Sequence, residues 1–337
     1  MDDSDMKMAD LSHLSSEQAE AARRFVDLKF QVDTMARDHS GYVPDDLHGP
    51  MGGGEYGPSH GMCFFNRIIP FLPRDSEVHE PEILYVPIAH TLGCSWRWWP
   101  DRYLSEENEE GIKLHIFSDY GIRSTSYTYI PELGLFLPGE GKNRVNFCRH
   151  HNINAIPARV YIHHYPKADR IKLYVKEEAT GRDILAVLDN RYVQKVDHYA
   201  FALPVLQAYG VIVSRKWPSD LPSTDDIRAY ASTSVNNELF YRPVVDLDKV
   251  RVAFTKKEEE AFIRTTLFHL LPVRKKFTYI FVFMLIFVVA MTLWDHLGEG
   301  SVANMLFAAG AFAVGSLFVM MVPVFRVRKK YLTDESQ

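Results

Sequence analysis

Cysteine and the familiar catalytic motifs are scarce in this sequence, and their scarcity excludes several classes of protein. Only three cysteines occur in 337 residues; this odd, low number argues against a disulfide framework and is typical of a reducing compartment. The chain has no G-x-S-x-G motif, no cysteine-protease signature and no Walker A motif, which excludes the enzymes defined by those motifs. It also lacks an Asn-x-Ser/Thr sequon, which is compatible with a cytosolic domain.

An excess of positive charge is absent as well, with 38 lysine and arginine residues against 43 aspartate and glutamate residues. The formal net charge is −5, so a generic basic nucleic-acid binder is excluded and no nucleic acid is expected as a partner. Residues 1–10 are acidic and polar without an apolar run, and we therefore expect no secretory signal there. The mean hydropathy of the whole chain is slightly negative, so residues 1–270 are expected to be water-soluble, with a core of their own.

Two long apolar runs near the C-terminus are the strongest signal in the sequence. Residues 277–294 and 302–325 contain no charged side chain. Because a helix rises about 1.5 Å per residue, each run can cross a hydrocarbon core of about 30 Å. The runs, joined by the short polar segment 295–301, predict a transmembrane hairpin. The alternative is a pair of buried helices in a soluble core, but such helices seldom run about 18 residues without a charge.

Lysine and arginine flank this hairpin on one side only. Residues 274–276 precede the first run and are all basic; Arg326, Arg328, Lys329 and Lys330 follow the second, and segment 295–301 has no basic residue. Since basic residues near helix ends prefer the cytoplasmic side, both termini are expected to be cytoplasmic. The protein is then a two-span integral membrane protein, of the inner membrane if the source is bacterial. The lipid bilayer is its first expected partner, and the basic clusters favour anionic head groups.

The remainder of the chain is expected to form an α+β cytosolic domain with a mainly antiparallel sheet. Ser15 and Gln18 fit a capping box that starts an amphipathic helix. Residues 52–57 match G-x-G-x-x-G formally, but without a strand before them or a helix after them, so they predict a loop and not a dinucleotide site. The expected organisation is an N-terminal amphipathic helix (1–40), a Gly/Pro-rich loop (41–61), the α+β domain (62–254), a juxtamembrane helix (255–271), two transmembrane helices (277–294 and 302–325) and a cytoplasmic tail (326–337).

Short β-branched and aromatic segments predict the strands of this domain. The clearest is a β-hairpin over residues 171–188, with a turn at 179–181. Because no long helix separates the strands, we expect antiparallel pairing. The other predicted strands are 63–72, 83–89, 112–117, 124–130 and 159–165; residues 106–110 are expected to be an acidic loop, and residues 192–209 and 225–236 to be helical.

Four residues are candidate metal ligands: Cys148, His150, His151 and His163. Sulfur and imidazole are the ligands that zinc prefers, yet structural zinc sites bring paired Cys or His arms, which are absent here. On a strand, His163 and its neighbour point to opposite faces. We therefore favour exposed polar histidines over a metal site, and we expect no cofactor.

Two further groups are candidate interfaces. Trp96, Trp98 and Trp99 lie in the segment SWRWWP, whose composition suits an interface or a membrane-surface anchor, although packing into a core is the favoured alternative. Within the second run, Ala311 and Gly315 form a small-x-x-x-small face that lets helices approach closely. The partner of this face would be the first helix or a second copy of the chain, which would make a homo-oligomer.

These features predict a membrane-anchored protein with a large cytosolic binding or regulatory domain, non-enzymatic, whose partner is an unidentified protein or small ligand. An effector or sensor that acts through the hairpin is a special case of this hypothesis. The alternative is a membrane-tethered metal-dependent hydrolase or nuclease that uses the histidine and cysteine cluster. The first is preferred because no catalytic arrangement in the sequence is specific.

Overall fold

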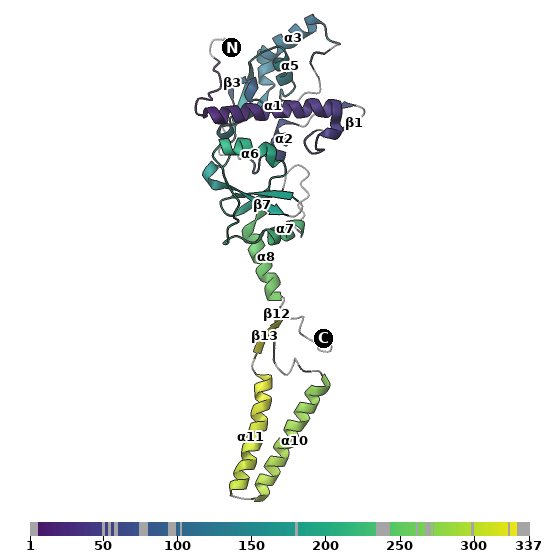
Figure 1. Cartoon of the computed structure of the whole chain (residues 1–337), viewed down its shortest axis with the longest axis vertical. Helices are drawn as coiled ribbons and strands as arrows, with labels where there is room; N and C mark the ends of the chain where they lie inside the picture. Colours follow the sequence, from purple (N-terminus) through teal and green to yellow (C-terminus); the bar gives the residue numbers. More distant parts are fainter. Residues whose placement is uncertain are drawn as a thin grey trace. The chain divides into compact units, whose positions relative to one another are not determined.

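The chain forms an α+β protein with mixed sheets and two apolar helices at its C-terminal end (Figure 1). It divides into two compact units, Met1–Val250 and Arg251–Gln337. The computed structural model describes residues 6–48, 51–52, 55–56, 60–73, 80–93, 99–101, 103–178, 181–233, 243–260, 262–266, 271, 273–297, 300–322 and 324–328.

Helix α1 (Ser16–His39) begins where the capping box predicts. The Ser15 hydroxyl accepts a hydrogen bond from the Gln18 backbone N–H at 3.1 Å, and the Gln18 side-chain oxygen accepts one from the Ser15 N–H at 2.9 Å. The helix packs against α6 (Tyr199–Ala208) and buries Phe25 and Val26. Lys29 and Asp33 are also buried, and they form an ion pair with each other, as buried charges require.

The first sheet of the larger unit has four strands in the order β3–β6–β4–β5. Strands β3 and β6 pair antiparallel, as do β4 and β5, whereas β4 and β6 pair parallel. The N-terminal segment covers the outer edge of β3, because Tyr85 exchanges backbone hydrogen bonds of 2.9 Å with Lys7 and Ala9. Covering an edge strand in this way blocks pairing with other chains. The strands are β3 (Glu82–Pro87), β4 (Ser126–Ile130), β5 (Leu135–Glu140) and β6 (Ala155–Ile162).

The second sheet has five strands in the order β10–β7–β8–β9–β11. The predicted hairpin over 171–188 is present as β7 and β8, paired in register from Ile171↔Leu188 to Glu178↔Gly181. Strand β10 pairs parallel with β7. The strands are β7 (Ile171–Glu178), β8 (Gly181–Leu188), β9 (Tyr192–Lys195), β10 (Ile212–Ser214) and β11 (Val245–Asp246).

The prediction of a mainly antiparallel sheet is therefore wrong, because both larger sheets are mixed. Each contains one parallel pair, formed when the chain returns to the sheet after a helix. In the first sheet the crossover includes β5 and α5 (Arg144–His150), and in the second it includes β9 and α6. Such crossovers allow parallel pairing, which a tight turn does not.

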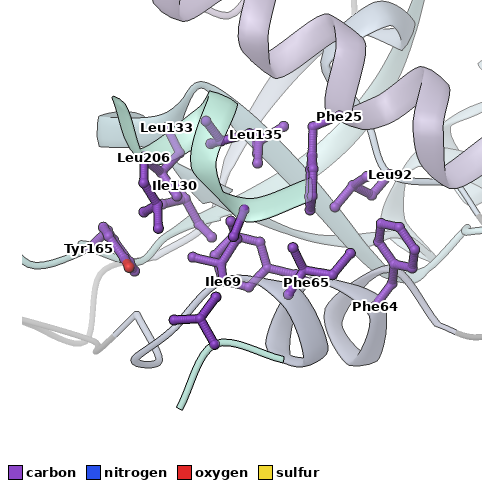
Figure 2. Close-up of a cluster of buried hydrophobic side chains, with 14 of the residues drawn as sticks. Phe25, Phe64, Phe65, Ile69, Leu92, Ile130, Leu133, Leu135, Tyr165 and Leu206 are labelled. Atoms are coloured by element: carbon purple, nitrogen blue, oxygen red, sulfur yellow. The ribbon is translucent and has the colours of Figure 1, made fainter. Parts of the chain in front are cut away.

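One large hydrophobic core connects both sheets with helices α1, α2 (Gly61–Ile68) and α6. Strand β5 alternates between two cores: Leu135 and Leu137 enter this one, and Phe136 enters a second core on the other face, with Tyr127 and Phe147. Figure 2 shows side chains of the larger core pointing into one cluster: Phe25, Phe64, Phe65, Ile69, Leu92, Ile130, Leu133, Leu135, Tyr165 and Leu206.

Several predicted elements have a different secondary structure. Residues 63–72 begin as helix α2 and 112–117 belong to helix α3 (Glu106–Phe117), whose first turn is the acidic segment expected to be a loop. Residues 192–209 contain strand β9 before α6, and the predicted strand 159–165 belongs to β6, in the other sheet from the β7–β8 hairpin. A short apolar run is compatible with either a strand or a helix. In these segments tertiary packing selects the secondary structure. The unit also contains α4 (Asp119–Arg123), α7 (Thr224–Thr233) and the short pair β1 (Met51–Gly52) and β2 (Glu55–Tyr56).

The helix predicted at 255–271 starts earlier and ends earlier. Helix α8 (Leu247–Glu260) runs through Thr255, the first residue of the predicted helix, and strand β12 (Phe262–Thr266) follows. Helices α10 (Val273–Leu297) and α11 (Ser301–Met321) then pack against each other. Strand β13 (Val324–Arg328) pairs antiparallel with β12, so the chain that leaves α11 forms a short ribbon with the chain that leads to α10.

Candidate functional site

The α10–α11 hairpin exposes most of its apolar surface. Its segments Lys275–His296 and Ser301–Met321 are long and apolar enough to cross a membrane. Only 6% of the most apolar window of α10 and 17% of that of α11 are buried. Phe281 is 68% exposed and Phe312 is 74% exposed. A core helix of a soluble protein would instead be mostly buried, and the residues that the structure describes form no core around these two helices.

The two helices meet through small residues, but not through the predicted pair. Ala290 of α10 and Gly310 of α11 are buried where the helices touch, and a Cβ atom at Gly310 would lie 3.6 Å from the Ala290 Cβ. Ala311 is exposed, and nothing lies within 4 Å of a Cβ built at Gly315. The prediction that α10 could pack on the Ala311/Gly315 face is therefore wrong for the contact within the chain. That face stays a candidate for contact with a second copy.

The ribbon formed by β12 and β13 carries arginines beside the hairpin. Its register pairs Arg264 directly with Arg326 and Phe262 with Arg328. The Arg326 guanidinium lies over the Phe262 ring, 4.7 Å from its centroid. Arg264 and Arg326 are both exposed, as is Lys275 at the start of α10. The sequence did not predict this ribbon, although the alternation of apolar and basic residues over 324–328 is typical of a strand.

The four candidate metal ligands are not gathered into one site, although the His150 and His151 rings lie 5.0 Å apart. Cys148 points into the second core, and burial raises the pKa of its thiol to about 12, so the thiol is protonated near neutral pH. His163 lies just after β6, where its backbone N–H donates to the Tyr129 carbonyl at 2.9 Å. Among the residues that the structure describes, no three Cys, His, Asp or Glu side chains are arranged to hold one metal ion.

His150 and His151 belong instead to an aromatic cluster on α5. The Trp99 ring stacks on His150 with centroids 6.3 Å apart, and it meets Phe147 edge-on at 4.8 Å. The His151 ring lies 4.3 Å from Phe147, and its Nε2 is 3.5 Å from a Glu109 carboxylate oxygen, too long for a good hydrogen bond. Trp99 therefore packs on the second core, as the favoured alternative for the tryptophans predicts. Trp96 and Trp98 lie outside the described residues.

Helices α3 and α4 present an exposed apolar surface that the sequence did not predict. Leu114 is 67% exposed, Tyr120 is 76% exposed and Phe117 is also exposed, while Ile116 of the same helix is buried. The hydroxyl of Ser105 caps α3 by accepting from the Asn108 N–H at 3.3 Å. A serine followed by acidic residues is a helix-start signal that could have identified α3. We call Leu114, Phe117 and Tyr120 the α3–α4 surface.

Acidic residues border this surface. Glu106, Glu107 and Glu110 on α3 and Asp119 on α4 are exposed. Lys113, whose Nζ lies 3.7 Å from a Glu110 carboxylate oxygen, and Arg123 at the end of α4 are exposed as well, so the rim carries both signs with acidic residues in excess. An apolar centre with a polar, charged rim is typical of a surface that binds another protein. No protein-family model, no curated protein and no solved structure matches this chain.

Proposed function

We propose that the chain is an integral membrane protein whose α10–α11 hairpin spans the bilayer and anchors the unit of residues 1–250 at the cytoplasmic face. The observation that carries this proposal is the exposure of the apolar side chains along both helices. Leaving one large apolar side chain in water costs about 1.5–3 kcal/mol relative to burial, and the hairpin exposes many. A bilayer removes this cost, and the basic residues that flank the hairpin on one side favour cytoplasmic termini.

Cysteine labelling of intact cells tests this orientation. In a background without the three native cysteines, Ser301→Cys should react with a membrane-impermeant maleimide from outside, because the turn faces outward. The matched control is Ser12→Cys, an exposed position of the larger unit, which should react only after permeabilisation. Labelling of Ser12→Cys in intact cells would reverse the orientation. Release of the native protein by alkaline carbonate would exclude a spanning hairpin.

We infer further that the larger unit acts by binding a protein and not by catalysis. The supporting observation is the α3–α4 surface, where Leu114 and Tyr120 are mostly exposed within a border in which acidic residues outnumber basic ones. The partner that fits has an apolar side chain surrounded by lysine or arginine, since opposite charges at the rim steer association. No specific observation favours a metal-dependent hydrolase or nuclease, because among the described residues no three of its proposed ligands are arranged to hold one metal ion.

Photo-crosslinking in cells tests the binding surface. A photoreactive phenylalanine analogue at Phe117 or Tyr120 should give one discrete crosslinked product. Tyr42 is a suitable control, since it is an aromatic residue that is 83% exposed on another part of the same unit. Adding Leu114→Glu should remove the product without changing the melting temperature, because Leu114 is already exposed. Equal products from Tyr42 and Tyr120, or persistence with Leu114→Glu, would refute the assignment.

A further inference from the structure

The β12–β13 ribbon places two positive charges directly opposite each other. Residues paired across antiparallel strands lie on the same face with Cβ atoms about 4.5–5.5 Å apart, and like charges in such positions repel. Arg264 and Arg326 occupy one such pair. Within the residues that the structure describes, neither guanidinium is paired with a carboxylate. An anion between the two guanidinium groups would turn this repulsion into a favourable arrangement.

The Arg326 side chain is positioned so that its N–H donors can bind such an anion. Its guanidinium carbon lies over the Phe262 ring, 4.7 Å from the centroid, and an aromatic ring takes none of the N–H groups as a conventional hydrogen-bond acceptor would. The N–H edges then remain available, and they match the spacing of phosphate oxygens in two parallel hydrogen bonds. Arg264 is exposed on the same face of the ribbon and can supply a second set of donors. The arrangement therefore suits one phosphate group.

The position of the ribbon identifies the source of that phosphate, provided that the hairpin spans the bilayer as proposed above. Val324 and Phe325 continue the apolar sequence of α11 and are 61% and 43% exposed. Arg326 is the first charged residue after this apolar stretch, so it lies where hydrocarbon gives way to head groups. Strand pairing brings Arg264 to the same depth, although it precedes α10 by several residues in the sequence.

We propose that Arg264 and Arg326 together bind the phosphate of an anionic phospholipid in the leaflet that borders the ribbon. A lipid such as phosphatidylglycerol has a net negative charge that both arginines can share. In phosphatidylcholine the choline group neutralises the phosphate, so this lipid relieves the repulsion less. This inference depends on the spanning hairpin, and the experiment below separates the failure of one from the failure of the other.

The test compares hydrogen exchange of the ribbon in two membranes. The full chain is placed in nanodiscs of phosphatidylcholine alone or of equimolar phosphatidylcholine and phosphatidylglycerol, and exchange is followed at residues 262–266 and 324–328. With phosphatidylglycerol the native ribbon should exchange about tenfold more slowly, the effect of roughly one strong charge-assisted hydrogen-bond pair. Arg264→Gln should exchange more slowly than the native ribbon in phosphatidylcholine, since repulsion is removed, and should gain less than about twofold from phosphatidylglycerol.

Matched variants separate a lipid site from other effects. Lys275→Gln removes the same charge beside the hairpin and should keep the full response to phosphatidylglycerol, whereas Arg326→Gln should lose it. Equal loss in Lys275→Gln would show diffuse attraction and overturn the site, as would fast exchange of Arg264→Gln in both lipids, which indicates a structural role. A protein that inserts but exchanges equally in both lipids refutes the lipid site alone. A protein that fails to enter either nanodisc refutes the spanning hairpin.

Discussion

Helices α6 and α10 are both rich in apolar residues, but they are buried to very different extents. Helix α6 has ten residues and places Ala202, Val205 and Leu206 in the larger core, where α1 covers it. Helix α10 has 25 residues, and only 6% of its most apolar window is buried. Composition alone does not distinguish a core helix from a membrane helix; length and the presence of covering elements do. Each prediction below tests this difference between the two units.

The largest expected effect concerns solubility. A fragment of residues 1–260, which keeps α8 whole, should be soluble without detergent and unfold in one cooperative transition, because its apolar side chains have partners in two cores. The full chain should require detergent. Solubility, near-ultraviolet circular dichroism and thermal unfolding measure this difference. A fragment that aggregates or lacks a cooperative transition would show that the larger unit depends on the hairpin.

The second prediction compares a buried phenylalanine with an exposed one. Phe65→Ala removes a ring that is 0% exposed in the larger core and should lower the free energy of unfolding of the fragment by about 3–5 kcal/mol. Phe312→Ala, at a position 74% exposed, should leave insertion of the full chain and the contact between α10 and α11 unchanged. Urea denaturation and membrane fractionation are the measurements. Similar damage from both changes would mean that Phe312 contacts protein.

The third prediction concerns the contact between the two apolar helices. Gly310→Ala should be tolerated, because the new Cβ meets Ala290 and Phe287 at 3.6 Å, an ordinary contact. Gly310→Leu adds atoms that this space cannot hold, and overpacking costs about 1–3 kcal/mol. Chemical crosslinking between α10 and α11 in membranes should be slower in Gly310→Leu and unchanged in Gly315→Leu. The opposite order would restore the predicted Ala311/Gly315 face as the contact within the chain.

Local signals were sufficient for some elements of the fold and insufficient for others. The capping box at Ser15, the β7–β8 hairpin and the two apolar helices depend on residues close in sequence, and the structure contains them. The parallel pairs β4–β6 and β7–β10 depend on segments separated by a crossover, and no local pattern specifies that register. Residues of helix α2 fall in the segment 63–72, for which the sequence predicts a strand, because phenylalanine and isoleucine favour strands. Tertiary packing overrides this preference.

The candidate sites show the same division. Basic residues beside the hairpin were evident in the sequence, but the opposition of Arg264 and Arg326 follows from strand pairing between distant segments. Exposure of Leu114 depends on which side of α3 faces the sheet, and the apolar residues at 112, 114 and 116 fit the two-residue period of a strand, which hides the helical arrangement. The histidine cluster was judged from spacing in sequence, while its surroundings are set by Trp99 and Phe147 from separate elements.

The smallest expected effect is a dependence on pH that belongs to the larger unit. His90 is 4% exposed, and its Nδ1 lies 2.8 Å from the Gly134 carbonyl, to which it donates. Burial lowers the pKa of His90 and outweighs this hydrogen bond, which favours the charged form. The unfolded chain therefore binds a proton that the folded chain resists, so stability is complete above the unfolded pKa of about 6.5 and falls as the pH decreases toward the folded value.

In the fragment of residues 1–260, this decrease should reach at most about 1.4 kcal/mol per pH unit from His90, the limit for one group. His90→Gln should flatten the decrease of the free energy of unfolding below that pH, whatever its effect on stability at neutral pH. His39→Gln is the control, since His39 is exposed at the end of α1, and the slope should remain. Urea titrations at a series of pH values measure both. An unchanged slope in His90→Gln would show that other groups bind the proton on unfolding, and the pH dependence would then not report on this core.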